Sequence, residues 1–192
     1  AIEHPCVMEA AERWFQGRLE IIPVDANGIV RIERVQTLLA SRTIGALAAM
    51  AANNETGVLQ PWQTLRQLCT ESGVPFVCDA TQWMGRLPGK ELGVCDYVFA
   101  SGHKFGAPVG IGFLKLPARA NGPTFQSLLL GGPQEDARRA GTQNVAAAAA
   151  FAAALNHSAA NMDSIAERLA IRARIESQLR ERIEGLRIIA ES

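Results

Sequence analysis

The stretch "YVFASGHKFG", residues 97–106, joins an apolar run to a glycine-flanked loop that carries a lysine. The run Tyr97-Val98-Phe99-Ala100 has the composition of a buried strand, and Lys104 follows it within four residues. A solvated loop lysine is the simplest interpretation of Lys104. The alternative is a lysine that binds a cofactor covalently, and that role requires matching groups elsewhere in the chain.

Short apolar runs alternate with helical patterns on both sides of this stretch. The patterns predict strands at residues 19–24, 44–50, 76–78, 97–100, 111–116 and 186–190. They predict helices at residues 5–16, 32–40, 61–72, 145–155 and 163–184, the last of which is capped by Asn161. This order predicts an α/β fold with a mostly parallel sheet flanked by helices.

Composition excludes several classes of partner. The 192 residues carry 19 basic and 19 acidic side chains, so no excess charge favours binding to nucleic acid or to a membrane surface. No apolar run is long enough to span a bilayer. The four cysteines lack the spacing of metal ligands, so no metal site is predicted, and Cys69 and Cys78 are expected to be buried. Free thiols favour a reducing, cytoplasmic location.

Polar clusters follow three of the predicted strands directly. Asn53-Asn54 follows the first, Asp79 to Gln82 follows the second, and Ser101 to Lys104 follows the third. Parallel sheets place their chemistry at the carboxyl ends of strands, so we expect these clusters to converge on one site.

The combination of side chains points to pyridoxal 5'-phosphate. This cofactor requires a lysine amine, an acidic partner for its ring nitrogen, and donors for its phosphate. Lys104 supplies the amine and Asp79 the acid, and Gln82 can donate to the phenolic oxygen of the ring. Ser101 and His103 can donate to the phosphate.

Five collinear segments resemble those of class V pyridoxal-phosphate enzymes, with the closest similarity to cysteine desulfurases of the iron–sulfur-cluster type. They are "EHPCV" (3–7), "ANNETG" (52–57), "CDATQ" (78–82), "SGHKFGAPVGIG" (101–112) and "RAGTQN" (139–144). The resemblance implies the large domain of a fold-type I pyridoxal-phosphate-dependent transferase. It also implies that Lys104 binds the cofactor and moves protons, and that His4 stacks over the ring and assists proton transfer.

The resemblance implies a cofactor-binding role for seven residues. Thr142 matches a threonine that reaches the phosphate of a neighbouring subunit, so a homodimer is implied. Asn54 matches an asparagine beside the ring. The full set is Asn54, Asp79, Gln82, Ser101, His103, Lys104 and Thr142.

Each assignment has a structural alternative. His4 and Asp79 are suited to capping a helix or a turn, and Thr142 is suited to capping the alanine-rich helix that follows it. Asn53 and Asn54 are common turn residues. Gln82 and Ser101, taken alone, do not indicate a binding site.

The chain departs from the family pattern in three features. It lacks the early Gly-Ala-Thr turn, the loop with the nucleophilic cysteine and the arginine that binds the substrate carboxylate. We therefore expect a fragment: residues 1–160 form the cofactor-binding domain without its N-terminal part, residues 161–185 a connecting helix, and residues 186–192 the start of a small domain.

The implied activity is conversion of L-cysteine to L-alanine, with the sulfur passed to an enzyme persulfide and then to an acceptor protein. A class V aminotransferase, a selenocysteine lyase-like enzyme and a non-catalytic relic of the fold remain alternatives. The residues of the three polar clusters do not discriminate among them.

Overall fold

The computed structural model describes residues 1–41, 43–117, 127–162 and 165–188. Its centre is a four-stranded sheet in the order β1 (Leu47–Met50), β2 (Phe76–Asp79), β3 (Tyr97–Ser101) and β4 (Gly112–Lys115). The first three strands are parallel, and β4 runs antiparallel to β3. The expected α/β class with a mostly parallel sheet is confirmed.

Alternate side chains of the strands build the core. Leu47, Phe76, Cys78 and Val98 occupy one face and are buried, as period-2 alternation requires. The neighbouring positions belong to the other face. Those in the middle of the strands, such as Val77, are more exposed, whereas Met50 and Asp79 at the strand ends are buried. The chain therefore has one densely packed face and one face that is free to carry polar groups at the strand ends.

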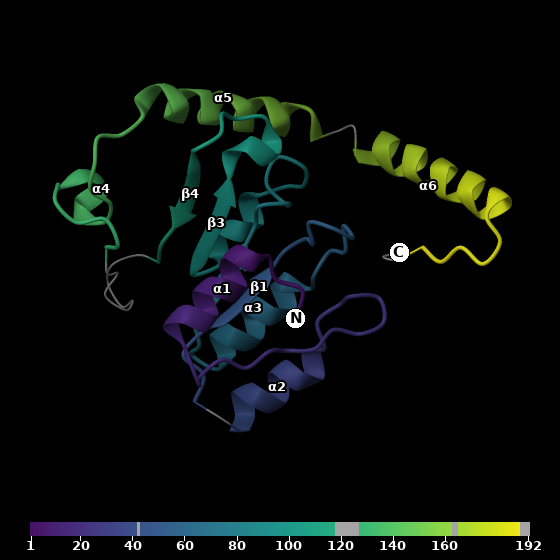
Figure 1. Ribbon diagram of the computed structural model, residues 1–192, viewed down its shortest axis with the longest axis horizontal. Coiled ribbons are helices and arrows are strands. Elements are labelled where there is room, and N and C mark those ends of the chain that lie inside the picture. Colours follow the sequence, from purple (N-terminus) through teal and green to yellow (C-terminus); the bar gives the residue numbers. More distant parts are fainter. Residues whose placement is uncertain (42, 118–126, 163–164, 189–192) are drawn as a thin grey trace.

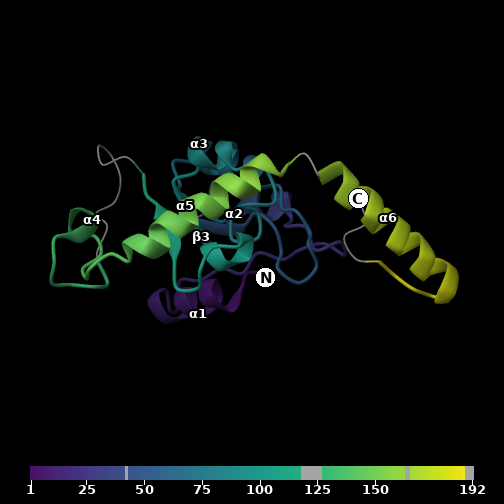
Figure 2. The same cartoon turned by 90° about the horizontal axis from the view of Figure 1, so that it is seen from above.

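Two helices cover the packed face. They are α2 (Ile32–Ser41), which contributes Val35, and α3 (Trp62–Glu71), whose Trp62 and Leu65 are fully buried. The short 3₁₀ helix η1 (Lys90–Val94) adds a further apolar contact to the same core. Figure 2 shows α3 and α1 (Pro5–Trp14) on opposite sides of the sheet. The N-terminal helix therefore approaches the face that α2 and α3 leave open.

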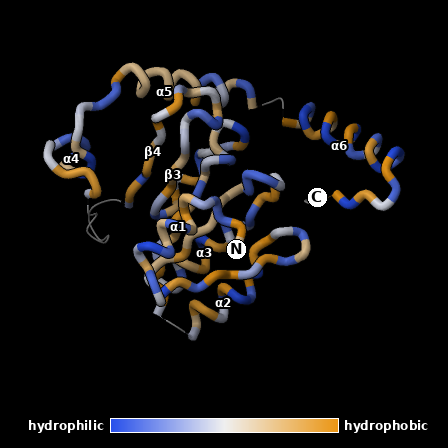
Figure 3. The backbone as a smooth tube through the Cα atoms, viewed as in Figure 1, coloured by the Kyte–Doolittle hydropathy of each residue, from blue (hydrophilic) through white to orange (hydrophobic). Residues whose placement is uncertain are grey.

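The C-terminal third of the described chain is helical. After the short α4 (Gln134–Ala137), α5 (Val145–Ala160) passes across the end of β3, and α6 (Ile165–Arg182) extends away from the sheet (Figures 1 and 2). Hydrophobic and hydrophilic residues alternate along α6 (Figure 3), and apolar side chains such as Leu169 and Ile175 are exposed. Among the described helices, none combines the length and apolar composition that a membrane span requires.

Three local predictions were wrong or fall partly outside the described residues. Residues 19–24 form no strand, because the turn after them is closed by Asp25 and leaves only an isolated bridge between Val24 and Val30. Asn161 is the C-cap of α5, and its side-chain amide donates to the carbonyl of His157. Its predicted role as the N-cap of the following helix concerns residues 163–164, which lie outside the described residues. Residues 186–188 are irregular, and the rest of that predicted strand lies outside the described residues.

Candidate active site at the carboxyl ends of the parallel strands

The sheet register brings the ends of three strands together. Met50 at the end of β1 is the register partner of Asp79 at the end of β2, and Asp79 is the partner of Phe99 in β3. Ser101 lies two residues beyond Phe99 and shares its face of the sheet. Two of the predicted polar clusters, at Asp79 and at Ser101, therefore follow adjacent strands at one edge.

Asp79 lies at the centre of this edge. Its side chain is only 6% exposed, and its Oδ1 atom accepts a hydrogen bond of 2.8 Å from the backbone N–H of Thr81. The alternative role predicted for Asp79, the capping of a turn, is thus partly confirmed, because one of its carboxylate oxygens holds the turn that follows β2. The alternation of the strand places the carboxylate on the open face, opposite buried Cys78.

The segment after β3 is the short 3₁₀ helix η2 (Gly102–Phe105). The hydroxyl of Ser101 and Nδ1 of His103 are hydrogen bonded at 2.9 Å, and the Lys104 side chain is exposed. Gly106 ends the helix with a φ of 91°, a left-handed conformation that favours glycine. The chain therefore holds a hydroxyl, an imidazole and an amine within one turn.

Helix α5 packs against η2 and fixes its position. The rings of Phe105 and Phe151 meet edge to face with centroids 5.1 Å apart, and Ser158 donates to the carbonyl of Phe105. A Cβ atom at buried Gly102 would lie 2.7 Å from the Phe151 ring. The tight packing against α5 therefore requires glycine at this position.

The N-terminal segment that contains His4 reaches the same edge, because Glu3 accepts a hydrogen bond from the N–H of Met50. His4 is the N-cap of α1, with Nδ1 accepting a hydrogen bond of 3.2 Å from the N–H of Cys6, so the capping alternative is realised. Partial burial raises the pKa of the Cys6 thiol, and the negative charge of Asp79 raises it further. The electrostatic influence of Asp79 therefore reaches the first turn of α1.

The other predicted residues, Asn54, Gln82 and Thr142, lie in turns or loops and differ in exposure. Asn54 is exposed in the turn after β1, a turn whose backbone is held by the neighbouring Asn53. Gln82 is half-buried in the turn after β2. Thr142 is exposed in the loop before α5, and that helix is capped by Asn144 rather than by Thr142. The structure thus removes the capping alternative for Thr142.

Only one lysine of the chain stands at the predicted edge. Lys90 belongs to η1, which precedes β3 and so lies at the amino end of that strand. Lys115 donates to the backbone carbonyls of Cys95 and Asp96. Lys104 alone follows the carboxyl end of a parallel strand.

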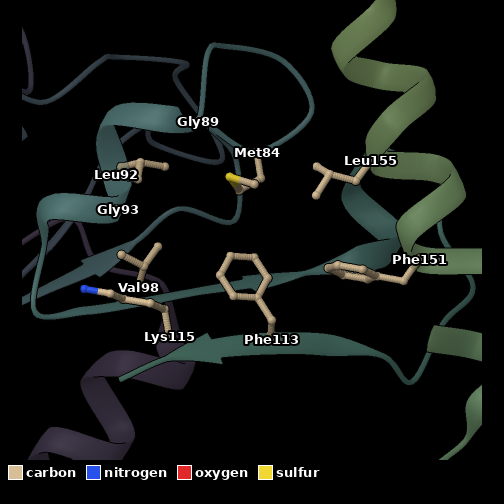
Figure 4. Close-up of a pocket in the computed structure, with 9 residues that line it drawn as sticks. All are labelled: Met84, Gly89, Leu92, Gly93, Val98, Phe113, Lys115, Phe151 and Leu155. Atoms are coloured by element: carbon tan, nitrogen blue, oxygen red, sulfur yellow. The ribbon is translucent and has the colours of Figure 1, made fainter. Parts of the chain in front are cut away.

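A separate apolar cavity lies between η1, the β3–β4 pair and α5 (Figure 4). Its volume is about 300 Å³, and its lining includes Leu92, Phe113 and Phe151. The amine of Lys115 is engaged with backbone carbonyls at its margin. None of the predicted site residues lines this cavity, so it does not belong to the site at the strand ends.

Two further residues organise the edge: Glu3, which sequence reasoning missed, and Asn53, which it placed in the first polar cluster. The Glu3 carboxylate accepts from the N–H of Met50, and the Asn53 amide donates to the carbonyl of Ile2. Glu3 precedes the first helix and follows no periodic pattern. Its adjacency to His4 within "EHPCV" was the one available signal.

The donor set matches the needs of pyridoxal phosphate. A buried carboxylate suits a protonated ring nitrogen, and the amine of Lys104 suits the cofactor's aldehyde. The hydroxyl and imidazole of Ser101 and His103 suit a phosphate, beside a backbone that glycine keeps accessible.

Known proteins resemble this chain in sequence and in fold. The family model "Aminotransferase class-V" matches residues 1–192. A cysteine desulfurase from Klebsiella pneumoniae is 36% identical over 183 residues, which are 93% of this chain and 45% of that protein. One from Gluconacetobacter diazotrophicus is 38% identical over 189 residues, with 95% and 46% covered. The solved structure of a NifS-like protein from Rickettsia africae aligns with a TM-score of 0.84 at 28% identity, over 100% of this chain and 52% of that one. The chain thus spans about half the length of the relatives that it matches.

Proposed function

The chain belongs to the aminotransferase class-V family, and we propose that it is the cofactor-binding part of a cysteine desulfurase. Class V aminotransferases and cysteine desulfurases depend on pyridoxal phosphate. The observation that carries the proposal is the placement of Asp79 and Lys104 after adjacent parallel strands, at the edge that the segment containing His4 also reaches. The relatives named cysteine desulfurase support the choice of substrate, L-cysteine.

When bound, pyridoxal phosphate supplies an electron sink for the α-carbon of an amino acid. Lys104 would hold it covalently and would then move protons at the α-carbon. The Asp79 carboxylate would accept a hydrogen bond from the ring nitrogen and keep that nitrogen protonated. His4 would stack on the ring and assist proton transfer.

The phosphate would be held by donors from three places. Ser101 and His103 would donate from the end of β3, and Thr142 would donate to the phosphate of a neighbouring subunit in a homodimer. Gln82 would donate to the phenolic oxygen, and Asn54 would line the ring. These roles are supported by the positions of the side chains at or near one edge of the sheet and by the matching segments.

The overall reaction breaks the C–S bond of cysteine and leaves alanine, with the sulfur taken by a thiolate as a persulfide. The thiolate, the arginine for the substrate carboxylate and the sulfur-acceptor protein would be supplied by other parts of the assembly. We propose residues 1–160 as the cofactor domain, 161–185 as the connecting helix and 186–192 as the start of a small domain. A cytoplasmic location is supported by the four unpaired thiols.

The test is a product assay on the full-length protein loaded with pyridoxal phosphate. We expect L-cysteine to yield alanine and, with a thiol reductant, sulfide in equal amounts. Transfer of the amino group to an α-keto acid would instead indicate an aminotransferase. A preference for selenocysteine would indicate a lyase for that substrate, and failure to bind the cofactor would indicate a relic of the fold.

A further inference from the structure

The carboxyl group of Glu3 lies beside β1, on the side of this outer strand that faces away from β2. Leu47 and Ala51 donate their N–H groups to Pro75 and Asp79 on the β2 side. Because N–H directions alternate along a strand, the N–H of Met50 points to the opposite side. Oε1 of Glu3 accepts that N–H at 2.8 Å. Glu3 is therefore bonded to the residue that stands directly beside Asp79 in the register.

A second bond holds the same segment. The side-chain amide of buried Asn53 donates to the carbonyl of Ile2 at 3.1 Å, and its Oδ1 accepts from the turn after β1. The chain before α1 is thus tied to the end of β1 at Ile2 and at Glu3. His4 follows immediately as the N-cap of the helix.

The other oxygen of Glu3 has a different environment. Oε2 is buried and has no hydrogen-bond partner among the described residues. Burial raises the pKa of Glu3, and the negative charge of Asp79 raises it further. The hydrogen bond from the N–H of Met50 and the positive charge of the Ala1 amino group lower this pKa, but the net shift is upward. The titratable groups facing Glu3 are those of Asp79, Ala1, Cys6 and Cys78. A neutral Glu3 carboxyl group is favoured because an ionised one would be a buried negative charge near Asp79 with one oxygen that lacks a hydrogen bond among the described residues.

We propose that Glu3 is a positioning residue, which fixes His4 relative to Asp79 by tying the segment before α1 to the end of β1. Its importance for catalysis rests on the proposed function, whereas the tie itself does not. Held to Met50, Glu3 sets where α1 begins and hence where the imidazole of His4 stands.

The tie is tested on the full-length protein without cofactor, by hydrogen exchange at the Met50 amide and by NMR titration of the His4 ring. Glu3→Ala removes the acceptor and should speed exchange at Met50 roughly tenfold. Glu3→Gln keeps an acceptor oxygen and should restore slow exchange. Glu9→Gln, on the exposed surface of α1, is the matched control and should change neither signal.

The charge state is tested in the same titration. The His4 resonance of the natural protein should show two inflections, its own and one from the ionisation of Glu3. Glu3→Gln should retain only the first. This comparison also covers the case in which Glu3→Ala does not fold. A single inflection in the natural protein, or Glu3→Gln behaving like Glu3→Ala at Met50, would overturn the proposal.

Turnover of the loaded enzyme links the tie to catalysis. Glu3→Ala should lower kcat more than it raises KM, and the loss should not add to that of His4→Ala, since both changes act on the same imidazole. Additive losses would overturn the positioning role. A protein without desulfurase activity in which Met50 and His4 respond as expected would refute the proposed function and leave the tie intact.

Discussion

The hydroxyl of Ser101, the last residue of β3, and Nδ1 of His103 lie 2.9 Å apart and are hydrogen bonded. The bond restricts rotation of the His103 imidazole, and Nε2 is the ring nitrogen that is not bonded to Ser101. A hydroxyl and a ring N–H that are oriented before a ligand arrives bind an anion at a lower entropic cost than two mobile side chains.

Replacing Ser101 tests this arrangement. Ser101→Ala should weaken the binding of pyridoxal phosphate roughly tenfold, because one donor is lost and the orientation of His103 is no longer restrained. A fluorescence titration with the cofactor measures the effect. Ser72→Ala, at the exposed C-terminus of α3, is the control and should bind normally. Equal affinity in both variants would remove Ser101 from the phosphate site.

Replacing the lysine after β3 tests the covalent attachment. After borohydride reduction in the presence of pyridoxal phosphate, mass spectrometry should locate the added mass at Lys104. Lys104→Ala should reduce the modification to background, whereas Lys90→Ala at the other end of β3 should leave it unchanged. Modification that persists in Lys104→Ala would place the attachment elsewhere.

The charge of Asp79 is separable from its structural role. Asp79→Asn keeps an oxygen for the N–H of Thr81, so the turn should persist, but the partner for a protonated ring nitrogen is lost. We expect the turnover of the full-length protein to fall roughly 10²–10³-fold. Asp25→Asn alters a similar turn that contains none of the predicted site residues and should retain activity. Thermal unfolding curves check that both variants are folded.

Local periodicity explains how much of this fold the sequence predicted. The strands that end at Met50, Asp79 and Ser101 are apolar runs whose burial leaves little choice of structure, and their parallel register places their carboxyl ends at one edge of the sheet. The segment 19–24 shows the limit of such reasoning. It has the composition of a strand, but a strand requires a neighbour with a free edge, and that requirement is not local.

Glu3 shows the same limit within the site. Nothing in the residues around it indicates that its carboxyl group meets Met50, which is 47 positions away along the chain. The bond depends on the direction in which α1 approaches β1. Sequence patterns that describe one element at a time do not contain that direction.

The glycine that begins η2 provides a test of packing. In Gly102→Ala the new methyl group would lie 2.7 Å from Cδ2 of Phe151 and 2.9 Å from Cβ of Ala107, so η2 must shift. We expect a loss of about 1–3 kcal/mol in the free energy of unfolding. Gly93→Ala meets no atom within 4 Å and is the control. Chemical denaturation measures both, and an unaffected Gly102→Ala would contradict the close contact with α5.

The thiols should differ in reactivity. Burial raises the pKa of Cys69 to about 11, so at pH 8 only a minute fraction is thiolate, and Cys78 and Cys95 are fully buried as well. Cys6 is exposed and should be the first site alkylated by iodoacetamide in the folded protein. Raising the pH toward 11 increases the thiolate fraction of Cys69, yet its modification should remain slow until unfolding. Rapid labelling of Cys69 at pH 8 would show that α3 opens readily.

The parallel crossovers that link β1, β2 and β3 also govern when this edge can form. Met50, Asp79 and Ser101 become neighbours only after long stretches of intervening chain have been synthesised and folded back, so the arrangement is absent from any short nascent segment. While the polypeptide emerges from the ribosome, its apolar strands are therefore exposed before their partners exist. Exposed apolar strands of this kind are prone to aggregate, and a bound cofactor can stabilise the chain only after the third strand has been added.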